Sequence, residues 1–282
     1  MSKYLDDLCA HIKDAGDNVY CITEICDGKP ETRVLQITNR CQNTYSISKL
    51  FTTTAIGILY DQGKMRMEEH LCDILREELP AGLDPRWETL TVDMALRHRL
   101  GLPAGYLDID VDDTCTFGWD HLTNLLTHPL EKDPDTEFCY TDAAFYLLGR
   151  AAEKKAGMPL DTFLWEHLFF PLQFTEAAWS RCPQGHVMGA TGLYLTSWDI
   201  AKLGEVYRCD GVWNGQRILS EAWCDLARRA PYELYPTGGD SYGKGGMYGQ
   251  MLLVIPEKKR VVAWLAYQDD MSGLIEAART LD

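Results

Sequence analysis

Ser46 and Lys49, a serine and a lysine three positions apart, are the pair in this chain whose types and spacing most clearly suggest chemistry. If the chain after Ser46 is helical, both side chains lie on one face, so the lysine nitrogen can reach the serine hydroxyl. Backbone N–H groups at the start of a helix also favour negative charge, including an alkoxide or a nearby oxyanion. The pair therefore predicts a nucleophile with its own base, able to attack a carbonyl carbon.

The same spacing occurs a second time, at Ser241 and Lys244. Ser46 is followed by an apolar run that reaches Tyr60, which predicts a buried helix. Ser241 lies among closely spaced glycines, where no helix is expected. The alternative interpretation of Ser46 is a residue that caps the helix while Lys49 points to solvent.

Further segments follow Ser46 in an order typical of a known family. Residues 138–142 lead into an apolar helical pattern, and residues 242–250 precede a predicted strand. Together with residues 46–52 and the stretch 91–103, they cover nearly the whole chain. In these segments the chain resembles the penicillin-recognising serine hydrolases, specifically the class C β-lactamase-like group that includes family VIII esterases and D-amino-acid peptidases.

The resemblance implies roles for three residues of the predicted site. Ser46 would be the nucleophile, and Lys49 and Tyr140 would move its protons. A tyrosine held near a lysine cation can act as a phenolate-like base or relay protons to the leaving group. The alternative for Tyr140 is a half-buried aromatic residue at the start of a helix.

The resemblance also assigns residues 242–250 to the edge of the cleft. Lys244 would contribute positive potential, while Gly245 and Gly246 would let a substrate approach the backbone. The backbone N–H groups of Ser46 and Met247 would form the oxyanion hole. The alternative is a flexible turn before a strand, with Lys244 in solvent.

Two residues depart from the family pattern. Asp142 stands where β-lactamases have an asparagine that orients substrate amides, so an acceptor with negative charge replaces a group that also donates. Its charge could pair with Lys49 and keep that lysine cationic. Gly245 replaces the serine or threonine whose hydroxyl helps to bind the β-lactam carboxylate. Both departures weaken the prediction of antibiotic hydrolysis.

The predicted function is therefore a serine hydrolase that cleaves an ester or amide through a Ser46 acyl-enzyme, without cofactor or metal. Its substrate would be a small-molecule ester, an amide or a short peptide. Two alternatives stay open: a non-catalytic ligand-binding or regulatory protein, and a β-lactamase or D-amino-acid peptidase. The G-x-S-x-G match at residues 239–243 lies among closely spaced glycines, where no strand-to-helix elbow is expected. The chain has no H-E-x-x-H motif, and its histidines are too scattered to suggest a serine–histidine–aspartate triad.

The elements that must position these residues come from both ends of the chain. Apolar periodicity predicts terminal helices, a β-hairpin before Ser46 and a second strand pair near the C-terminus. The predicted ranges are helices 4–14, 200–207 and 271–281, strands 19–25, 33–37, 250–255 and 260–266, and a mostly helical region 52–171.

The predicted fold class is α/β of the α+β type, with an antiparallel sheet built from both chain ends, flanking helices and an inserted helical lobe. One catalytic unit is expected over residues 1–282. Its α/β lobe would span about 1–50 and 185–282, and its helical lobe about 51–184.

Composition excludes several classes of partner. The chain has 46% hydrophobic residues and a net charge of −15, which argue for a globular protein that binds neither nucleic acid nor an anionic membrane. The ten cysteines form no C-x-x-C pair, so a zinc site is not expected. They are expected to be small buried thiols in a reducing compartment. The acidic N-terminal segment does not resemble a signal peptide, which predicts a cytoplasmic protein.

Overall fold

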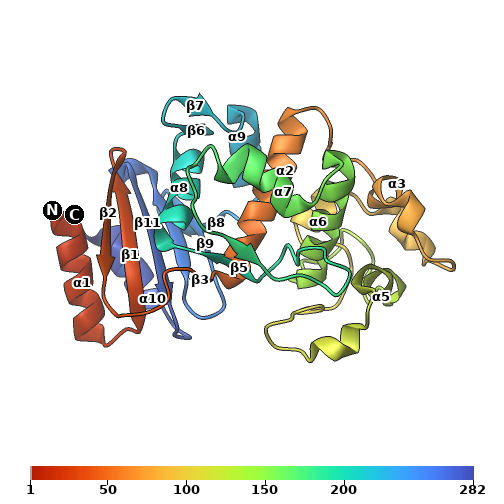
Figure 1. Cartoon of the computed structure of the whole chain (residues 1–282), viewed down its shortest axis with the longest axis horizontal. Helices are drawn as coiled ribbons and strands as arrows, with labels where there is room; N and C mark the ends of the chain where they lie inside the picture. The colour runs from red at the N-terminus through yellow and green to blue at the C-terminus, as the bar shows by residue number, and fades with distance from the viewer. Residues whose placement is uncertain (1) are drawn as a thin grey trace.

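A six-stranded antiparallel sheet joins the two ends of the chain in the computed structural model, which describes residues 2–282 (Figure 1). The strand order is β2-β1-β11-β10-β9-β8, so an N-terminal hairpin pairs directly with the last strand. The strands are β1 (Val19–Cys26), β2 (Lys29–Val34), β8 (Tyr235–Gly238), β9 (Ser241–Gly245), β10 (Met251–Ile255) and β11 (Arg260–Ala266). This arrangement confirms the predicted sheet.

Helices cover both faces of this sheet. The terminal helices α1 (Lys3–Ala15) and α10 (Ser272–Thr280) lie on one face, and α8 (Ser197–Arg208) lies on the other (Figure 1). Alternate residues of β10 and β11 enter the two apolar cores, because neighbouring side chains of a strand point to opposite faces. The predicted terminal helices and last two strands are confirmed to within one or two residues.

The remaining helices form a second body beside the sheet (Figure 1). Its centre is α2, which packs against α6, and every residue of α2 from Ser48 to Leu59 is buried. The helices are α2 (Ser48–Asp61), α3 (Leu71–Ile74), α4 (Val92–Leu96), α5 (His121–Thr127), α6 (Asp142–Ala156), α7 (Leu160–Leu164) with a π-helical turn Trp165–Phe169, and α9 (Glu221–Arg229). The lobe boundaries near residues 51 and 184 stay a prediction.

Short strands connect the two bodies. β3 precedes the nucleophile segment and pairs with β5, which also pairs with β4, while β6 and β7 form a hairpin over α8. Their bounds are β3 (Gln42–Asn43), β4 (Ala178–Trp179), β5 (Leu193–Leu195), β6 (Val212–Trp213) and β7 (Gln216–Arg217).

The predicted position of the second strand is wrong. The sequence suggested a strand over residues 33–37, but β2 ends at Val34, and Ile37 is fully exposed. Asp27 and Gly28 form a two-residue turn with positive φ at both positions, which brings β2 back at once. Pro30 is tolerated inside β2 because this strand lies at the edge of the sheet.

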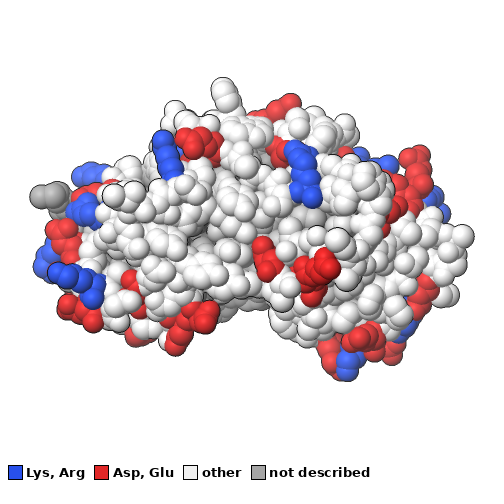
Figure 2. Space-filling model, turned by 60° about the horizontal axis from the view of Figure 1, so that its bottom comes forward, with Lys and Arg blue, Asp and Glu red and all other residues white. Residues whose placement is uncertain are grey.

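Other structural expectations have mixed outcomes. All ten cysteines are free, but only Cys72, Cys182 and Cys224 are buried and Cys115 is exposed, so the prediction of buried thiols is wrong for most of them. Among residues 2–282, no helix combines the length and apolarity that crossing a membrane requires. On the face shown in Figure 2, basic side chains lie interspersed with acidic ones.

Candidate active site

Ser46 lies in a tight turn between β3 and α2. A single 3₁₀ turn, Tyr45–Ile47, precedes the α-helix, and Tyr45 enters it with φ of +49°, a conformation that non-glycine residues rarely adopt. The expected helix start at Ser46 is therefore wrong by two residues, since α2 begins at Ser48. Ser46 makes no capping hydrogen bond, so its hydroxyl is left for other contacts.

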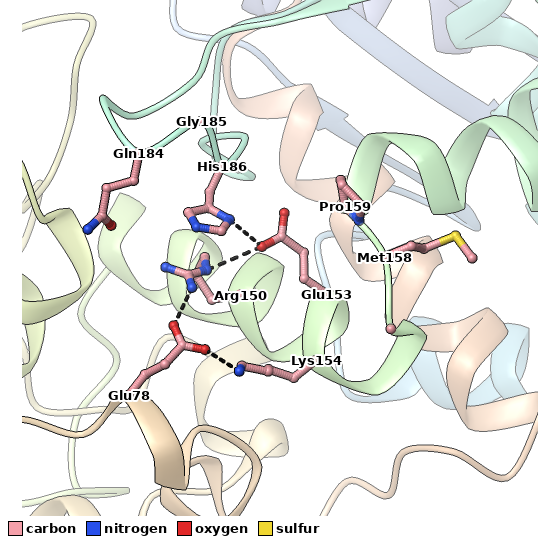
Figure 3. Close-up of a pocket in the computed structure, with 10 residues that line it drawn as sticks. Glu78, Arg150, Glu153, Lys154, Met158, Pro159, Gln184, Gly185 and His186 are labelled. Atoms are coloured by element: carbon pink, nitrogen blue, oxygen red, sulfur yellow. Dashed lines mark hydrogen bonds and ion pairs between the residues drawn. The ribbon is translucent and has the colours of Figure 1, made fainter.

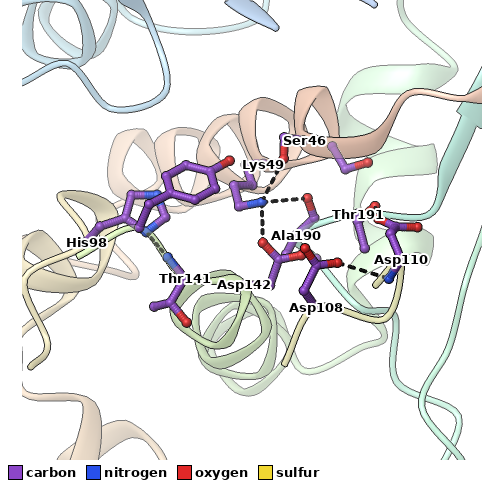
Figure 4. A network of polar contacts seen from close by, with 12 residues as sticks. Ser46, Lys49, His98, Asp108, Asp110, Thr141, Asp142, Ala190 and Thr191 are labelled. Atoms are coloured by element: carbon purple, nitrogen blue, oxygen red, sulfur yellow. Dashed lines mark hydrogen bonds and ion pairs between the residues drawn. The ribbon is translucent and has the colours of Figure 1, made fainter. Parts of the chain in front are cut away.

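Lys49 directs its ammonium group at the serine. Its Nζ donates to Ser46 Oγ at 3.1 Å, to Asp142 Oδ1 at 2.6 Å and to the Ala190 carbonyl oxygen at 3.2 Å (Figure 4). The side chain is completely buried, so the alternative of a lysine in solvent is wrong. These three acceptors use all three N–H groups of an ammonium.

The pKa of Lys49 reflects two opposing effects. Burial lowers it, but attraction to the Asp142 carboxylate, with smaller contributions from Tyr140 and Glu233, outweighs burial and holds the pKa above its usual value. Lys49 is therefore cationic at neutral pH. The sequence had suggested that the charge of Asp142 could pair with Lys49, and the structure contains this ion pair.

Tyr140 lies between two buried lysines. Lys49 Nζ and Lys244 Nζ are 4.7 Å and 4.8 Å from the centre of its ring, and Lys244 Nζ donates to the phenol oxygen at 3.0 Å. Lys244 comes from β9 and is buried, so the alternative that places it in solvent is wrong. The structure thus brings Ser46, Lys49, Tyr140 and Lys244 together.

Glu233 and His98 belong to the same cluster, although neither was predicted to act there. Glu233 is completely buried, forms an ion pair with Lys244 and accepts a hydrogen bond from His98 Nε2 at 2.8 Å. His98 Nδ1 accepts from the Thr141 N–H at 3.2 Å (Figure 4), so the proton of a neutral imidazole lies on Nε2. His98 lay within the segment 91–103 that resembled the family, while no pattern marked Glu233.

Opposing effects also set the pKa values of this pair. Burial raises the pKa of Glu233, but the cation of Lys244, the His98 hydrogen bond and Lys49 lower it to about 2. Burial lowers the pKa of His98 despite its contact with Glu233. At neutral pH the pair is therefore a carboxylate beside a neutral imidazole.

The glycine-rich segment lies against the nucleophile turn. A Cβ on Gly246 would be 2.7 Å from the Thr44 carbonyl oxygen, so only glycine allows this approach. Met247 follows, and within residues 2–282 its N–H meets no hydrogen-bond acceptor. Gly245 is more open, because a Cβ there would meet atoms no closer than 3.7 Å.

Two further carboxylates lie beside Asp142. Asp108 Oδ1 accepts from the Asp110 N–H at 2.9 Å, and Asp110 accepts from Thr191 and from Asn43 (Figure 4). Burial, with the nearby charge of Asp142, raises the pKa of Asp108 to about 6. The sequence offered no signal for these residues beyond a loop rich in acidic and aromatic side chains.

A separate hollow of about 470 Å³ lies at the other end of α6, around Glu78, Arg150, Glu153 and His186 (Figure 3). Its charged groups pair with one another: Arg150 with Glu78 and Glu153, and His186 with Glu153. In the described residues 2–282, no group of three or more histidine, cysteine or acidic side chains could hold a metal ion.

An antiparallel sheet flanked by helices, with a serine, two lysines and a tyrosine gathered beside it, defines a protein of the β-lactamase and penicillin-binding-protein fold. The chain belongs to the Beta-lactamase family, a family of hydrolases, which it matches over residues 39–281. This membership confirms the resemblance inferred from the sequence motifs.

Similar proteins have varied descriptions. The chain is 28% identical over 147 residues to a probable fimbrial assembly protein FimD, serogroup H1, of Dichelobacter nodosus, covering 50% of this chain and 36% of that protein. It is 25% identical over 228 residues to penicillin-binding protein 4 of Amycolatopsis lactamdurans, covering 70% of this chain and 59% of that protein. The match therefore spans less than two thirds of each of these relatives.

Solved structures share the fold at low identity. A family VIII carboxylesterase has a TM-score of 0.77 at 18% identity, covering 98% of this chain and 96% of that chain. A penicillin-binding protein homologue from Caulobacter crescentus has a TM-score of 0.75 at 16% identity, covering 98% and 95%. These likenesses confirm the predicted fold class.

Proposed function

We propose that the protein is a serine hydrolase that cleaves an ester or amide bond through an acyl-enzyme on Ser46, without a cofactor. The observation that carries this proposal is the hydrogen bond from Lys49 Nζ to Ser46 Oγ beside a tyrosine held between two lysines. The substrate is a small-molecule ester, an amide or a short peptide. Nucleic acids and membranes are not expected to bind.

In acylation, the Tyr140 oxygen takes the proton of Ser46 Oγ while that oxygen attacks the carbonyl carbon. Lys49 is an ammonium with three acceptors, so it cannot take this proton and instead stabilises the developing alkoxide. The backbone N–H groups of Ser46 and Met247 hold the oxyanion. Tyr140 then donates its proton to the leaving group as the bond to the carbonyl carbon breaks.

Deacylation repeats the same steps with water. Tyr140 accepts a proton from the water that attacks the acyl carbon, and the proton returns to Ser46 Oγ as the acid product leaves. Lys244 Nζ stays within 3.0 Å of the Tyr140 oxygen and places a positive charge beside it. All transferred protons thus pass through Tyr140, and both lysines act as fixed positive charges.

The two departures from the family pattern favour esters or amides over β-lactams. Asp142 pairs with Lys49, and its carboxylate has no N–H that could donate to a substrate. Gly245 offers no hydroxyl to a substrate carboxylate. The acidic side chains Asp108 and Asp110 would repel the carboxylate of a penicillin.

The proposal is tested by intact-mass spectrometry after brief exposure to p-nitrophenyl acetate, a fluorophosphonate or a penicillin. We expect wild-type protein to gain one acyl or phosphonyl group on Ser46, and Ser46→Ala to gain none while it keeps its circular dichroism spectrum and melting temperature. Turnover of p-nitrophenyl acetate should fall by a factor of about 10⁴ or more in Ser46→Ala.

The outcomes separate the alternatives. Equal turnover by Ser46→Ala would overturn the mechanism. Absence of any adduct on folded wild-type protein would favour a non-catalytic binding protein, and acylation by the penicillin faster than by the ester would favour a β-lactamase or D-amino-acid peptidase.

A further inference from the structure

Two residues outside the proposed proton path form a closed ring of contacts with it. Tyr140 contacts Lys244, Lys244 pairs with Glu233, Glu233 accepts from His98, and His98 returns to the backbone beside Tyr140. We propose that His98 and Glu233 are positioning residues that fix the orientation of Tyr140 and keep the charge of Lys244 beside its phenol. This inference rests on the proposed function, because it assigns Tyr140 the role of base.

His98 holds the chain on both sides of Tyr140. Its carbonyl oxygen accepts from the Cys139 N–H at 2.8 Å, and its Nδ1 accepts from the Thr141 N–H at 3.2 Å. Its ring also packs on the Tyr140 ring, with 4.4 Å between centres and an interplanar angle of 32°. One histidine therefore holds the N–H groups of the residues before and after the tyrosine and contacts one face of its ring.

Glu233 fixes the other two members of the ring. One carboxylate oxygen accepts from His98 Nε2 at 2.8 Å and from the Tyr235 hydroxyl at 3.1 Å, and the other pairs with Lys244. Because Glu233 accepts a hydrogen bond from Nε2, the proton of the imidazole stays on Nε2. Nδ1 is then free to accept from the Thr141 N–H. The carboxylate thus couples the lysine on β9 to the segment that carries Tyr140.

Both residues adopt backbone conformations that non-glycine residues rarely take. The φ angle is +54° at His98 and +59° at Glu233. Such conformations persist where the surrounding contacts hold them, and they are concentrated at functional sites. Their occurrence at the two ends of one hydrogen bond is an observation independent of the ring itself.

The charges on both sides of Tyr140 are paired. Lys49 on α2 is paired with Asp142 on α6, and Lys244 on β9 is paired with Glu233. The other facing groups, Tyr235 on β8 and His98, are neutral at pH 7. Removing the Glu233 charge leaves Lys244 uncompensated beside the phenol, so the surroundings of Tyr140 should change.

The test compares Glu233→Gln with Glu153→Gln. Each change replaces a carboxylate that pairs with a histidine and a cation, but Glu153 pairs with His186 and Arg150 (Figure 3). Glu153 lies eleven positions beyond Asp142 on α6, about 16 Å along the helix axis. The probe is the Tyr140 Cζ resonance of protein labelled with ¹³C-tyrosine, assigned by its absence from Tyr140→Phe.

We expect the Tyr140 Cζ resonance to shift in Glu233→Gln, because the charge and contacts beside the phenol change, and to stay unchanged in Glu153→Gln. The kcat for p-nitrophenyl acetate should fall about tenfold in Glu233→Gln with KM nearly constant, because orientation and not binding is lost. A wild-type Tyr140 resonance and a wild-type kcat in folded Glu233→Gln would overturn the inference.

His98 is tested by a pair of variants of similar volume. Gln can still accept from the Thr141 N–H and donate to Glu233, whereas Leu can do neither. We expect His98→Gln to keep a kcat within about threefold of wild type and His98→Leu to lose about tenfold, with both variants folded at the assay temperature. Equal losses in both would overturn the positioning role. Because the resonance needs no turnover, it tests the ring even if Ser46 proves unreactive.

Discussion

At the scale of single residues, the site is governed by charges that are buried in pairs. The Lys49 ammonium meets Asp142, and the Lys244 ammonium meets Glu233, with all four side chains almost entirely buried. Removing one member of a buried pair leaves an uncompensated charge, which costs about 3–5 kcal/mol, whereas removing both costs much less. Stability measurements can therefore detect these pairs without any substrate.

Asp142→Asn tests the first pair and restores the residue that the family usually has. We expect its free energy of unfolding at pH 7 to fall by about 3 kcal/mol, because Lys49 loses its carboxylate while remaining buried. Urea unfolding measures this change. The double variant Lys49→Met/Asp142→Asn should recover part of the loss, and a double variant less stable than Asp142→Asn would contradict the pairing.

The sequence supplied only part of this cluster. Ser46, Lys49 and Tyr140 were predicted because they fall in short motifs, where residues near in sequence act together. Glu233 could not be predicted, because its partner His98 lies 135 positions away in the chain. The identity of a buried acid's partner depends on how distant segments pack, and no local pattern records it.

At the scale of elements, α2 is positioned by close packing as well as by its apolar surface. Gly57 lies against α9, where a Cβ would be 2.2 Å from Nε1 of the buried Trp223. Gly273 on α10, by contrast, has no positive φ, and a Cβ added there would meet nothing within 4 Å. Residue 57 therefore has no room for a larger side chain, whereas residue 273 does.

Gly57→Ala should lower the free energy of unfolding by about 1–3 kcal/mol, since the rigid indole must shift. Gly273→Ala is the matched control and should raise it by about 0.5–1 kcal/mol through its higher helix propensity. Both values come from urea unfolding. A similar change in unfolding free energy in the two variants would show that contact with Trp223 does not limit the size of the side chain at position 57.

The end of β9 beside the nucleophile turn offers a second comparison of glycines. A side chain at Gly245 has space, because the nearest atoms to a Cβ would be 3.7 Å and 3.8 Å away, whereas one at Gly246 would meet the Thr44 carbonyl oxygen. We expect Gly245→Thr to raise the rate of labelling by a fluorescent penicillin about tenfold, since it restores a hydroxyl for the substrate carboxylate.

Gly246→Ala serves as the contrasting variant and should slow labelling by the fluorophosphonate. An unchanged penicillin rate in folded Gly245→Thr would mean that the missing hydroxyl does not limit β-lactam binding.

Most elements were predictable because their apolar residues repeat with the period of a helix or a strand. The second strand of the hairpin was misplaced because its register depends on the turn at Asp27 and Gly28, and these two turn residues outweigh the apolar residues that follow. The two-residue error at Ser46 has a similar cause, since Thr44 and Ser48, on either side of the 3₁₀ turn, hydrogen-bond to Leu193 of the distant β5.

At the scale of the whole molecule, the buried carboxylate of Glu233 links stability to pH. Its pKa falls from 4.5 to about 2 on folding, so its contribution is present above about pH 4.5 and is lost as the pH drops toward 2. This contribution amounts to about 3 kcal/mol. Glu233→Gln should therefore flatten the acid limb of the curve of unfolding free energy against pH.

Asp108 provides a control of opposite sign. Its pKa rises on folding from 3.8 to about 6, so stability declines as the pH increases through this range. Asp108→Asn should gain stability relative to wild type at pH 8 and none at pH 3. A steeper acid limb in Glu233→Gln would contradict the assigned direction.

The sheet that joins both ends of the chain also constrains biosynthesis. β1 and β2 leave the ribosome long before β11, which pairs with β1 and follows about 230 residues later. At a translation rate of about 5–20 residues per second, the hairpin waits roughly 10–50 s with one edge unpaired. Chaperones that shield nascent chains should therefore contact residues 19–34 throughout synthesis. A chain that stalls before β11 cannot complete the sheet and is open to proteolysis.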